Sequence, residues 1–338
     1  MSPTFDTHDL PQELCAPALA LVGFTGLDTL NNAVHRSIWD AFSNARTADR
    51  APVTFKLLSP DQEFPPLKPR RNSYEWYLPK GILKRNWMDK HLNQLPAVVV
   101  IFYDLDWDDP FWNEKKLECA SRVHSLRYSR ILHGLSTGAA LEGRGCRVAV
   151  TLLQQAPAAL PAGEDVVAIE RGNALKTACA LNAKSLFVLP HGDHLQGYII
   201  RLEKAFYELS QSYYHQRIKG VRSHLDQLNR SNQQYLFVRH QFKMGFFSEL
   251  KQDYPLAHKH YTKAYGHLLE IRILENNCSE IKTVAGYINY KLCRLMFLHL
   301  NYFREAIAQF RSHIDQFRTR VFGPRELEFE HHAWMCNQ

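Results

Sequence analysis

The pattern of apolar and polar positions changes near Gly197. Before this residue, short apolar runs that are rich in β-branched residues or Leu alternate with longer stretches of helical length, which is typical of strands buried on both faces of a sheet. The predicted strands are residues 18–24, 53–58, 97–103, 146–153 and 185–189. The predicted helices between them are residues 27–44, 110–126 and 164–181, each long enough to cross over a parallel sheet. The first half therefore predicts an α/β layered domain with a mainly parallel sheet.

After Gly197 the apolar positions recur only at helical spacing. The predicted helices are residues 195–215, 218–229, 233–251, 255–276, 278–300 and 302–320. Short polar segments join them, which implies that successive helices pack as antiparallel neighbours. The second half is therefore all-α, and we expect two domains, 1–212 and 213–338, because 338 residues exceed what one ordinary hydrophobic core serves.

Part of the helical half matches the pattern of tetratricopeptide (TPR) repeats. Ala257, Tyr261 and Ala264 lie at i, i+4 and i+7, as in the second helix of such a repeat, and Met244-Gly245 precedes them where the repeat has a Leu-Gly pair. The segment 302–310 repeats the start of this pattern at a longer offset. The pattern predicts antiparallel helix pairs that begin a TPR-like α-solenoid, and an ordinary helical bundle stays open as the alternative.

Polar signals mark two of the predicted helix starts in the first half. Asp28 lies at the mouth of the helix 27–44, and Asp108-Asp109-Pro110 precedes the helix 110–126. A carboxylate facing the positive end of a helix and a Pro in the first turn both favour helix initiation.

Charge and cysteine usage restrict the function classes. The net charge of +7 and the pI near 9.0 allow a weak anionic partner, but the basic residues are interspersed with acids, so nucleic acid is not expected. The cysteines are Cys15, Cys119, Cys146, Cys179, Cys278, Cys293 and Cys336. Their odd number and the lack of a C-x-x-C pair predict buried thiols in a reducing compartment, without disulfides or zinc. No signal peptide and no apolar run of roughly 20 residues is present, so we expect a cytosolic protein.

Residues 59–96 form a long segment in which Pro, aromatic and basic residues alternate. Tyr74, Trp76 and Tyr77 lie in its centre. A loop this long is usually functional or docked, so we interpret it as a loop that docks within the chain or on a partner. Binding of single-stranded nucleic acid or of an anionic membrane through its aromatic and basic residues remains an alternative. A second irregular segment, 131–145, is rich in Gly and is interpreted as an insertion.

Carboxylates gather where the third predicted strand ends. Asp104, Asp106 and Asp108 could hold Mg²⁺ there, because ligands of open α/β sheets bind outside the carboxyl ends of the strands. This is the basis of the alternative function, a Mg-dependent enzyme that transfers phosphoryl or glycosyl groups. We favour turn and helix-cap roles for these residues.

Other short motifs have structural interpretations too. Gly23-Phe24-Thr25-Gly26 resembles part of a phosphate loop but lacks the pattern and the Lys of one, so a tight strand-to-helix turn is favoured. His191-Gly192-Asp193-His194 is spaced too closely for three ligands of one tetrahedral metal ion, so a helix-cap role of Asp193 is favoured. There is no G-x-S-x-G elbow. We therefore expect no catalytic, metal-binding or cofactor-binding residues.

Several long stretches carry a specific resemblance to a known family. They are residues 73–84, 184–190, 198–203, 237–243, 246–253 and 285–291. They resemble subunit eleven of the trafficking protein particle (TRAPP) complex, the foie gras or gryzun family, from about residue 11 to residue 338. In that family the foie gras homology region opens around residues 285–300, and the members run far beyond residue 338.

The resemblance implies a non-catalytic scaffold subunit of a tethering complex that acts in transport between endoplasmic reticulum and Golgi and in autophagy. It implies other TRAPP subunits as partners, a Rab-family GTPase reached only indirectly, a cytoplasmic location at Golgi and intermediate membranes through the complex, and no cofactor. We expect the helix 233–251 and the loop 74–83 to dock on a partner. The candidate partner-binding residues are Tyr74, Trp76, Tyr77, Arg239 and Lys243.

Overall fold

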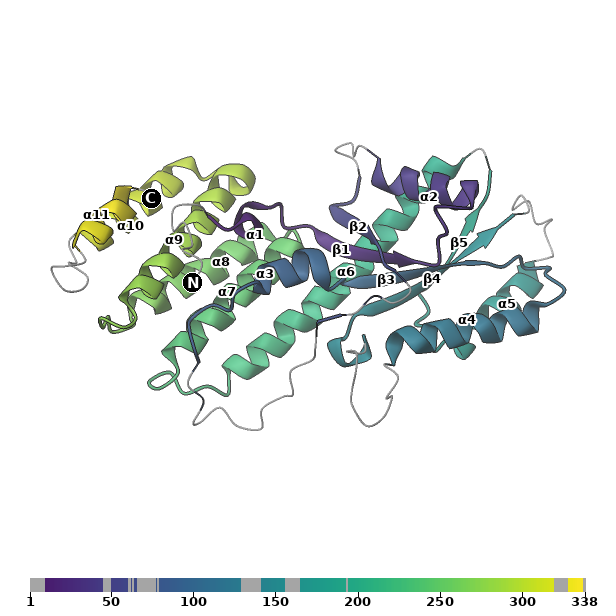
Figure 1. Ribbon diagram of the computed structural model, residues 1–338, viewed down its shortest axis with the longest axis horizontal. Coiled ribbons are helices and arrows are strands. Elements are labelled where there is room, and N and C mark those ends of the chain that lie inside the picture. The colour runs from purple at the N-terminus through teal and green to yellow at the C-terminus, as the bar shows by residue number, and fades with distance from the viewer. Residues whose placement is uncertain are drawn as a thin grey trace, which may run out of the picture. The chain divides into compact units, whose positions relative to one another are not determined.

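The chain divides into two compact units in a computed structural model (Figure 1). The structure describes residues 10–44, 50–59, 62, 64, 65, 77, 79–128, 141–155, 165–192, 194–318 and 328–336. The sheet unit comprises Leu19–Pro69 and Lys90–Tyr213, and the helical unit comprises Met1–Ala18, Arg70–Asp89 and Tyr214–Gln338. Two segments of the first half thus group with the helices. That 1–212 and 213–338 are separate domains stays a prediction.

The sheet unit contains a five-stranded parallel sheet of order β2-β1-β3-β4-β5. The strands are β1 Ala20–Thr25, β2 Val53–Leu57, β3 Val98–Asp104, β4 Arg147–Gln154 and β5 Leu186–Pro190. In the centre, Val22 of β1 lies between Phe55 of β2 and Val98 of β3. The continuous apolar runs of β3 and β4 are buried along almost their whole length, as expected for strands covered on both faces. The predicted α/β class with a parallel sheet is confirmed.

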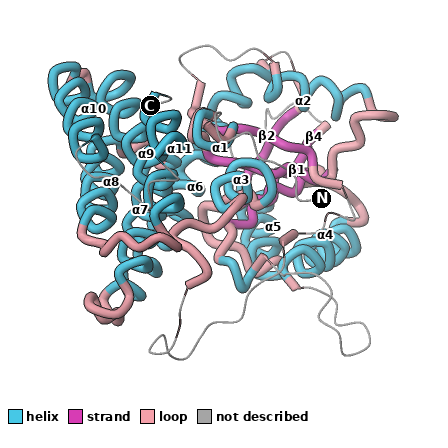
Figure 2. Tube along the Cα trace, turned by 60° about the vertical axis from the view of Figure 1, so that its left-hand side comes forward, coloured by secondary structure: helices cyan, strands magenta, loops and turns pink. Residues whose placement is uncertain are grey.

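Helices cover both faces of this sheet (Figure 2). They are α2 Ala33–Ser43 and the first part of α6 Leu195–Leu225 on one face, and α4 Trp112–Arg127 and α5 Asp165–Ala178 on the other. Phe24 of β1 is completely buried at the centre of the first face, with ring centroids 4.8 Å from Phe42, 4.9 Å from Phe102 and 5.9 Å from Phe206. This aromatic cluster fastens α2 and α6 to the sheet. Two short elements, the π-helical turn Lys90–Gln94 and the 3₁₀ turn Glu142–Arg144, complete the unit.

Helix α2 begins later than predicted. Asp28 accepts the backbone N–H groups of Leu30 at 3.2 Å and Asn31 at 3.0 Å, which forms a separate turn. Asn32 is the N-cap instead, and its side chain accepts the N–H groups of Val34 and His35. The prediction that Asp28 starts this helix is therefore wrong.

The helical unit is a stack of antiparallel helices (Figures 1 and 2). They are α7 Gln234–Leu250, α8 Tyr254–Leu269, α9 Cys278–Leu295, α10 Phe303–Arg318 and α11 Glu328–Cys336, and the π-helical turn Met296–Leu300 extends α9. Asn301 ends that turn in the left-handed conformation, with φ 57°. Two predictions are corrected: the segments 195–215 and 218–229 are one continuous helix, α6, and the helix predicted to reach residue 276 ends at Leu269.

The predicted repeat pattern corresponds to a tight contact between α7 and α8. Ala257, Tyr261 and Ala264 are fully buried. Gly245 of α7 faces the ring of Tyr261, because a Cβ atom at Gly245 would lie 2.7 Å from Tyr261 Cε1. A glycine here lets the two helices approach with an aromatic side chain between them, which is the packing that the TPR-like spacing predicts.

An N-terminal segment completes the helical unit. The short helix α1, Gln12–Cys15, ends in three backbone carbonyls that accept hydrogen bonds from Arg294 Nη1. They are those of Leu14 at 3.3 Å, Cys15 at 2.5 Å and the C-cap Ala16 at 3.4 Å. Gln252 donates to the carbonyl of Ala18 at 2.8 Å. No pattern in the sequence indicated α1 or its docking on α9, because the segment is short and carries no helical periodicity.

Candidate functional site

The segment that follows the Pro-rich loop docks on α7 and α9. Arg239 of α7 is only 5% exposed, and its guanidinium donates to the carbonyl of Ile82 at 2.7 Å and to that of Gly81. From α9, the Glu280 carboxylate accepts the backbone N–H of Ile82 at 2.5 Å. A Cβ atom at Gly81 would lie 2.6 Å from Glu280 Oε1, so the backbone approaches this carboxylate closely. The Gly81–Ile82 clip, formed by these two residues with Arg239 and Glu280, holds the segment on the helices.

A few residues later the short helix α3, Trp87–Asp89, adds an aromatic contact. The ring centroid of Trp87 lies 5.6 Å from that of Phe246 and 5.3 Å from that of Phe247, both on α7. Lys243 Nζ lies 5.5 Å from the Trp87 centroid, a cation–π contact. Residues 81–87 of this region are thus docked on helices of the same unit, in agreement with its interpretation as a docked segment.

The structure gives intramolecular contacts to two of the candidate partner-binding residues. Arg239 holds the clip and Lys243 lies against Trp87, while Tyr77 is half-buried. Tyr74 and Trp76 lie outside the described residues. A role of these five residues in binding a partner stays a prediction.

A buried charged network joins α7, α8 and α9. Lys291 of α9 is 0% exposed, and its Nζ lies 3.2 Å and 3.3 Å from the two carboxylate oxygens of Glu249 on α7. The same carboxylate accepts a hydrogen bond from the Tyr261 hydroxyl of α8. Burial, followed by the charge of Glu249, raises the pKa of Tyr261 well above its usual value, so this hydroxyl stays a proton donor. The repeat spacing indicated only that Tyr261 packs between helices, because nothing in the local sequence indicates Glu249 and Lys291, which lie 12 and 30 positions away.

The carboxylates of Asp104 and Asp106 at the carboxyl end of the sheet hold neighbouring loops together. His35 Nδ1 accepts the backbone N–H of Asp28 at 3.0 Å, so its other ring nitrogen carries the hydrogen and donates to Asp104 Oδ1 at 3.2 Å. Asp106 Oδ1 accepts the backbone N–H of Gln155 at 2.8 Å. These contacts link the loops after β1, β3 and β4 at the point where the strand order reverses.

Asp109 serves the start of α4. Its carboxylate binds Lys115 Nζ at 2.5 Å and accepts the N–H of Phe111 at 2.8 Å, and these two hydrogen bonds, the one from Lys115 first, lower its pKa. The helix begins at Trp112, two residues after the predicted start. The described residues contain no group of three His, Cys, Asp or Glu side chains placed to hold one metal ion. The side chains of Asp104 and Asp106 thus make long-range contacts with His35 and Gln155 instead of the predicted local turn contacts. Asp109 supports the start of α4, but the N-cap of this helix is Phe111 and not an aspartate.

The other short motifs are accounted for as follows. Gly26 has φ +89°, and a Cβ atom there would lie 2.1 Å from the Phe102 carbonyl oxygen, so the turn after β1 requires glycine. His191 and His194 are exposed, whereas Asp193 and most of the segment 131–145 lie outside the described residues. None of the described helices is both long and apolar enough to cross a membrane.

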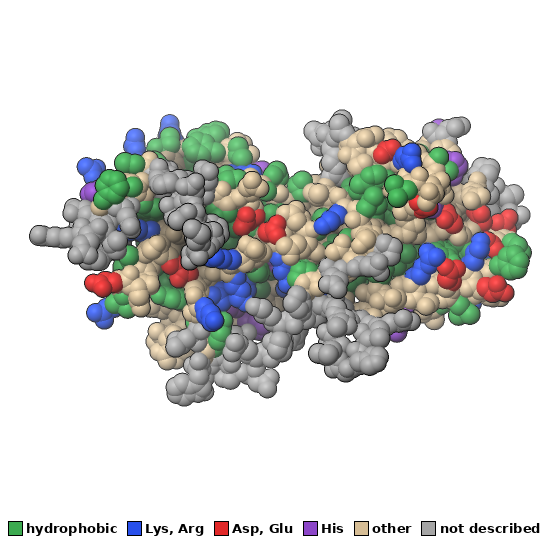
Figure 3. Space-filling view, in the orientation of Figure 1, with side chains coloured by type: hydrophobic (Ala, Val, Ile, Leu, Met, Phe, Trp, Pro, Cys, Tyr) green, Lys and Arg blue, Asp and Glu red, His purple; other side chains and the backbone are tan. Residues whose placement is uncertain are grey.

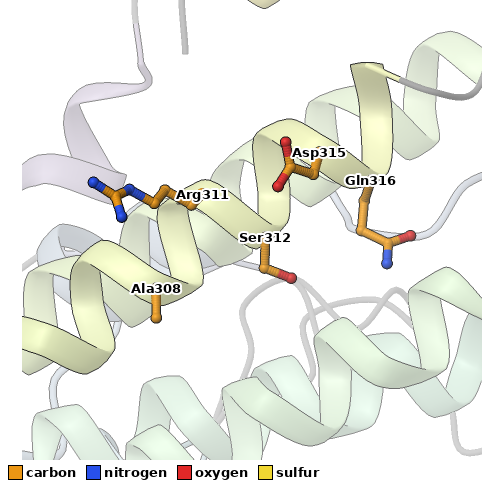
Figure 4. A pocket seen from close by; sticks show the side chains of 5 residues that line it. All are labelled: Ala308, Arg311, Ser312, Asp315 and Gln316. Atoms are coloured by element: carbon orange, nitrogen blue, oxygen red, sulfur yellow. The ribbon is translucent and has the colours of Figure 1, made fainter.

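A shallow, open hollow lies on α10. It is lined by Ala308, Arg311, Ser312, Asp315 and Gln316, all from this one helix (Figure 4). A hollow with a single helical wall offers no convergent set of catalytic groups. The candidate site is therefore the docking region of the helical unit.

Comparison with known families covers both units. Residues 41–196 match the family "Trafficking protein particle complex subunit 11 N-terminal domain", and residues 277–338 match the family "Foie gras liver health family 1". The chain is 56% identical over 338 residues to trafficking protein particle complex subunit 11 of Homo sapiens and to that of Bos taurus, and 56% identical over 330 residues to that of Gallus gallus. The chain belongs to the subunit 11 family. Its whole length matches the human and bovine proteins, of which it spans 28%.

The family assignment agrees with the resemblance seen in the sequence. The foie gras match begins at residue 277, the residue before α9, which is slightly earlier than the expected opening around residues 285–300. The match to the subunit 11 N-terminal domain includes β2 to β5 and ends at the start of α6. Arg239, Lys243 and Glu249 lie between the two matched segments, whereas their partners in the clip, the cation–π contact and the buried ion pair lie within them. The alignment with the human protein includes all of these residues.

Proposed function

We propose that this chain is a non-catalytic scaffold part of a TRAPP-type tethering complex, acting in transport between endoplasmic reticulum and Golgi and in autophagy. Its partners would be other TRAPP subunits, and it would reach a Rab-family GTPase and Golgi or intermediate membranes only through that complex. The observation that carries the proposal is the 56% identity along the whole chain to subunit 11 of the human complex. The stacked helices with their buried polar clips add a rigid surface of the kind that scaffolds present.

A chimera tests the proposal without depending on a fragment. The N-terminal part of the human subunit that matches this chain is replaced by the chain itself, and the chimera is expressed in cells lacking the endogenous subunit. We expect affinity capture with quantitative mass spectrometry to recover the other subunits in the same ratios as with the human protein. A folded, normally expressed chimera that is left out of the complex would overturn the proposal.

Substitutions that test a partner-binding surface must leave the fold intact, and this requirement decides which positions are suitable. Arg239 is unsuitable for charge reversal, because removing its guanidinium releases the Gly81–Ile82 clip before any partner is affected. Exposed side chains that form no hydrogen bond or ion pair in the described part of the chain, such as those of Arg201 and Lys204 on α6, serve as control substitutions. Assembly should be unchanged by Arg201→Gln and Lys204→Gln.

A further inference from the structure

The excess positive charge of the chain lies in its helical half. Residues 1–213 contain equal numbers of basic and acidic residues, so the whole formal net charge of +7 belongs to residues 214–338. A local excess of this kind raises the potential over one part of the molecule and attracts anionic groups to it. Part of this excess positive charge is exposed on the helices.

Three exposed cations gather over α6 and α8. Arg222 is near the end of α6, and Lys259 and Lys263 lie one turn apart on the same face of α8. None of the three forms an ion pair with any carboxylate in the described part of the chain, including Asp226, which lies one turn beyond Arg222. We call Arg222, Lys259 and Lys263 the α6–α8 surface.

Contacts through α7 bring these helices together. The ring of His224 on α6 lies 6.4 Å from that of His240 on α7, and Gln241 of α7 accepts a hydrogen bond from His260 Nδ1 of α8 at 2.8 Å. His260 is 6% exposed, and its Nε2 atom is buried without a hydrogen-bond partner in the described structure. The α6–α8 surface therefore has an unpaired polar atom beneath its cations.

The electrostatic environment of His260 shows that the three cations act on one place. Burial, followed by the charges of Arg222, Lys263 and Lys259, lowers the pKa of His260 to about 4. Asp253 is the acidic group that opposes them, but its carboxylate already accepts the N–H of Leu256 as the N-cap of α8. At this place three cations thus act against one carboxylate.

We propose that the α6–α8 surface binds an acidic, Asp- or Glu-rich segment of a protein partner. The proposal rests on the proposed scaffold function and deepens it by naming the chemistry of a partner. A protein segment fits better than a membrane, because no large apolar side chain between residues 201 and 273 is exposed for insertion. It also fits better than single-stranded nucleic acid, because the surface lacks exposed aromatic rings on which bases could stack.

Binding of a defined acidic probe tests the proposal independently of complex assembly. A fluorescein-labelled decamer of glutamate is titrated with the full chain and followed by anisotropy at low and at physiological salt. We expect binding that weakens with salt, and an affinity reduced about tenfold by Arg222→Gln, Lys259→Gln and Lys263→Gln together. The control triple Lys184→Gln, Arg201→Gln and Lys204→Gln removes the same charge from exposed positions of the sheet unit and should change the affinity less than twofold.

Three outcomes would overturn the proposal. In the first, the wild-type chain does not bind the glutamate peptide. In the second, both triple variants weaken binding equally, which would show that net charge alone attracts the peptide. In the third, phosphatidylserine vesicles or a single-stranded oligonucleotide bind the wild-type chain more tightly than the peptide does, and the triple variant of the α6–α8 surface no longer binds them. This result would assign the surface to a membrane or a nucleic acid. Circular dichroism of each variant confirms that it is folded. A chimera that assembles normally while the peptide fails to bind would leave the scaffold function intact and reject only this surface.

Discussion

The sheet unit and the helical unit are stabilised by different interiors. In the sheet unit the centre is apolar, with Phe24 among five other rings and strands β3 and β4 buried almost throughout. In the helical unit charged groups lie inside, above all Lys291 with Glu249 and Arg239 on backbone carbonyls. The sheet unit also buries one ion pair, that of Arg50 with Glu203 at 2.5 Å, but its strands are positioned mainly by apolar burial. The helices of the other unit are joined by several specific polar contacts, which are costly when one partner is lost.

The largest expected effect comes from the centre of the sheet. Phe24→Ala should lower the free energy of unfolding of the sheet unit by about 4 kcal/mol, because it removes a fully buried ring and leaves a cavity. Urea denaturation gives the magnitude, and hydrogen exchange should show lost protection in β1 and β3 with little change in α7 to α9. Leu30→Ala, at a side chain 82% exposed, is the control. Equal loss of protection in both units would contradict this separation.

The helical unit should respond most to a broken ion pair. Lys291→Met leaves the Glu249 carboxylate buried without its cation, and we expect a loss of about 3 kcal/mol in the free energy of unfolding of this unit. Adding Glu249→Leu should recover part of the loss, since the pair is then replaced by apolar side chains. Lys263→Met, at an exposed position of α8, provides the matched control and should cost little. An unchanged stability of Lys291→Met would show that apolar burial also carries this unit.

Acid should weaken the helical unit more than the sheet unit. Burial, with Lys243, His224 and Arg239 nearby, lowers the pKa of His240 to about 4, so this ring stays neutral in the folded chain while it gains a proton in the unfolded chain below pH 6.5. The stability that depends on the neutral ring is present above pH 6.5 and is lost as the pH falls toward 4. Between pH 7 and pH 5 we expect a loss of about 2 kcal/mol from this group. Urea titrations at both pH values measure it.

A substitution supplies the comparison for this pH effect. His240→Gln removes the titrating ring, so the difference in unfolding free energy between pH 7 and pH 5 should become smaller even if the variant is less stable at pH 7. Hydrogen exchange locates the change in α7 and its neighbours. The same acid sensitivity with and without His240 would mean that other groups cause it.

The smallest effect on stability is expected at the uncovered side of α10. Phe303, Ile307 and Phe310 are 51%, 47% and 40% exposed, and Figure 3 shows apolar side chains gathered over this end of the helical unit. Ile307→Ser and Phe310→Ser should change the free energy of unfolding by less than about 1 kcal/mol, because these side chains keep much of their surface in water. Self-association in sedimentation velocity should nevertheless decrease. Ala308→Ser, on the polar face of the same helix, should leave it unchanged.

The sequence predicted those parts of the fold that rest on local periodicity. The five strands appear where the apolar runs placed them, and the spacing of Ala257, Tyr261 and Ala264 indicated the packing of α8 on α7. The predicted break between residues 215 and 218 does not exist, because Ile218 is buried and the apolar face of α6 continues through it. A predicted helix start was wrong where a side chain accepts hydrogen bonds within a separate turn, as Asp28 does.

The candidate site was predicted less completely. Aromatic and basic residues identified the segment around residues 74–87 as docked, and Arg239 and Lys243 were named for a surface role on their charge. Their actual contacts with Gly81, Ile82 and Trp87 join positions about 150 residues apart, and no local pattern encodes such a pairing. Glu280 and Arg294 were missed for the same reason, since each acts on a backbone group whose chemistry is common to all residues.

The Gly81–Ile82 clip has a consequence for the synthesis of the protein on the ribosome. Ile82 is made 198 positions before Glu280, and Leu14 is made 280 positions before Arg294. The sheet unit is translated in full before the helices that bind these two segments. Both segments therefore leave the ribosome before their binding partners on α9 have been made. A chaperone that shields short apolar peptides would find its substrate in this interval. A truncation that removes Leu14, Cys15 and Ala16 would therefore deprive Arg294 on α9 of its acceptors.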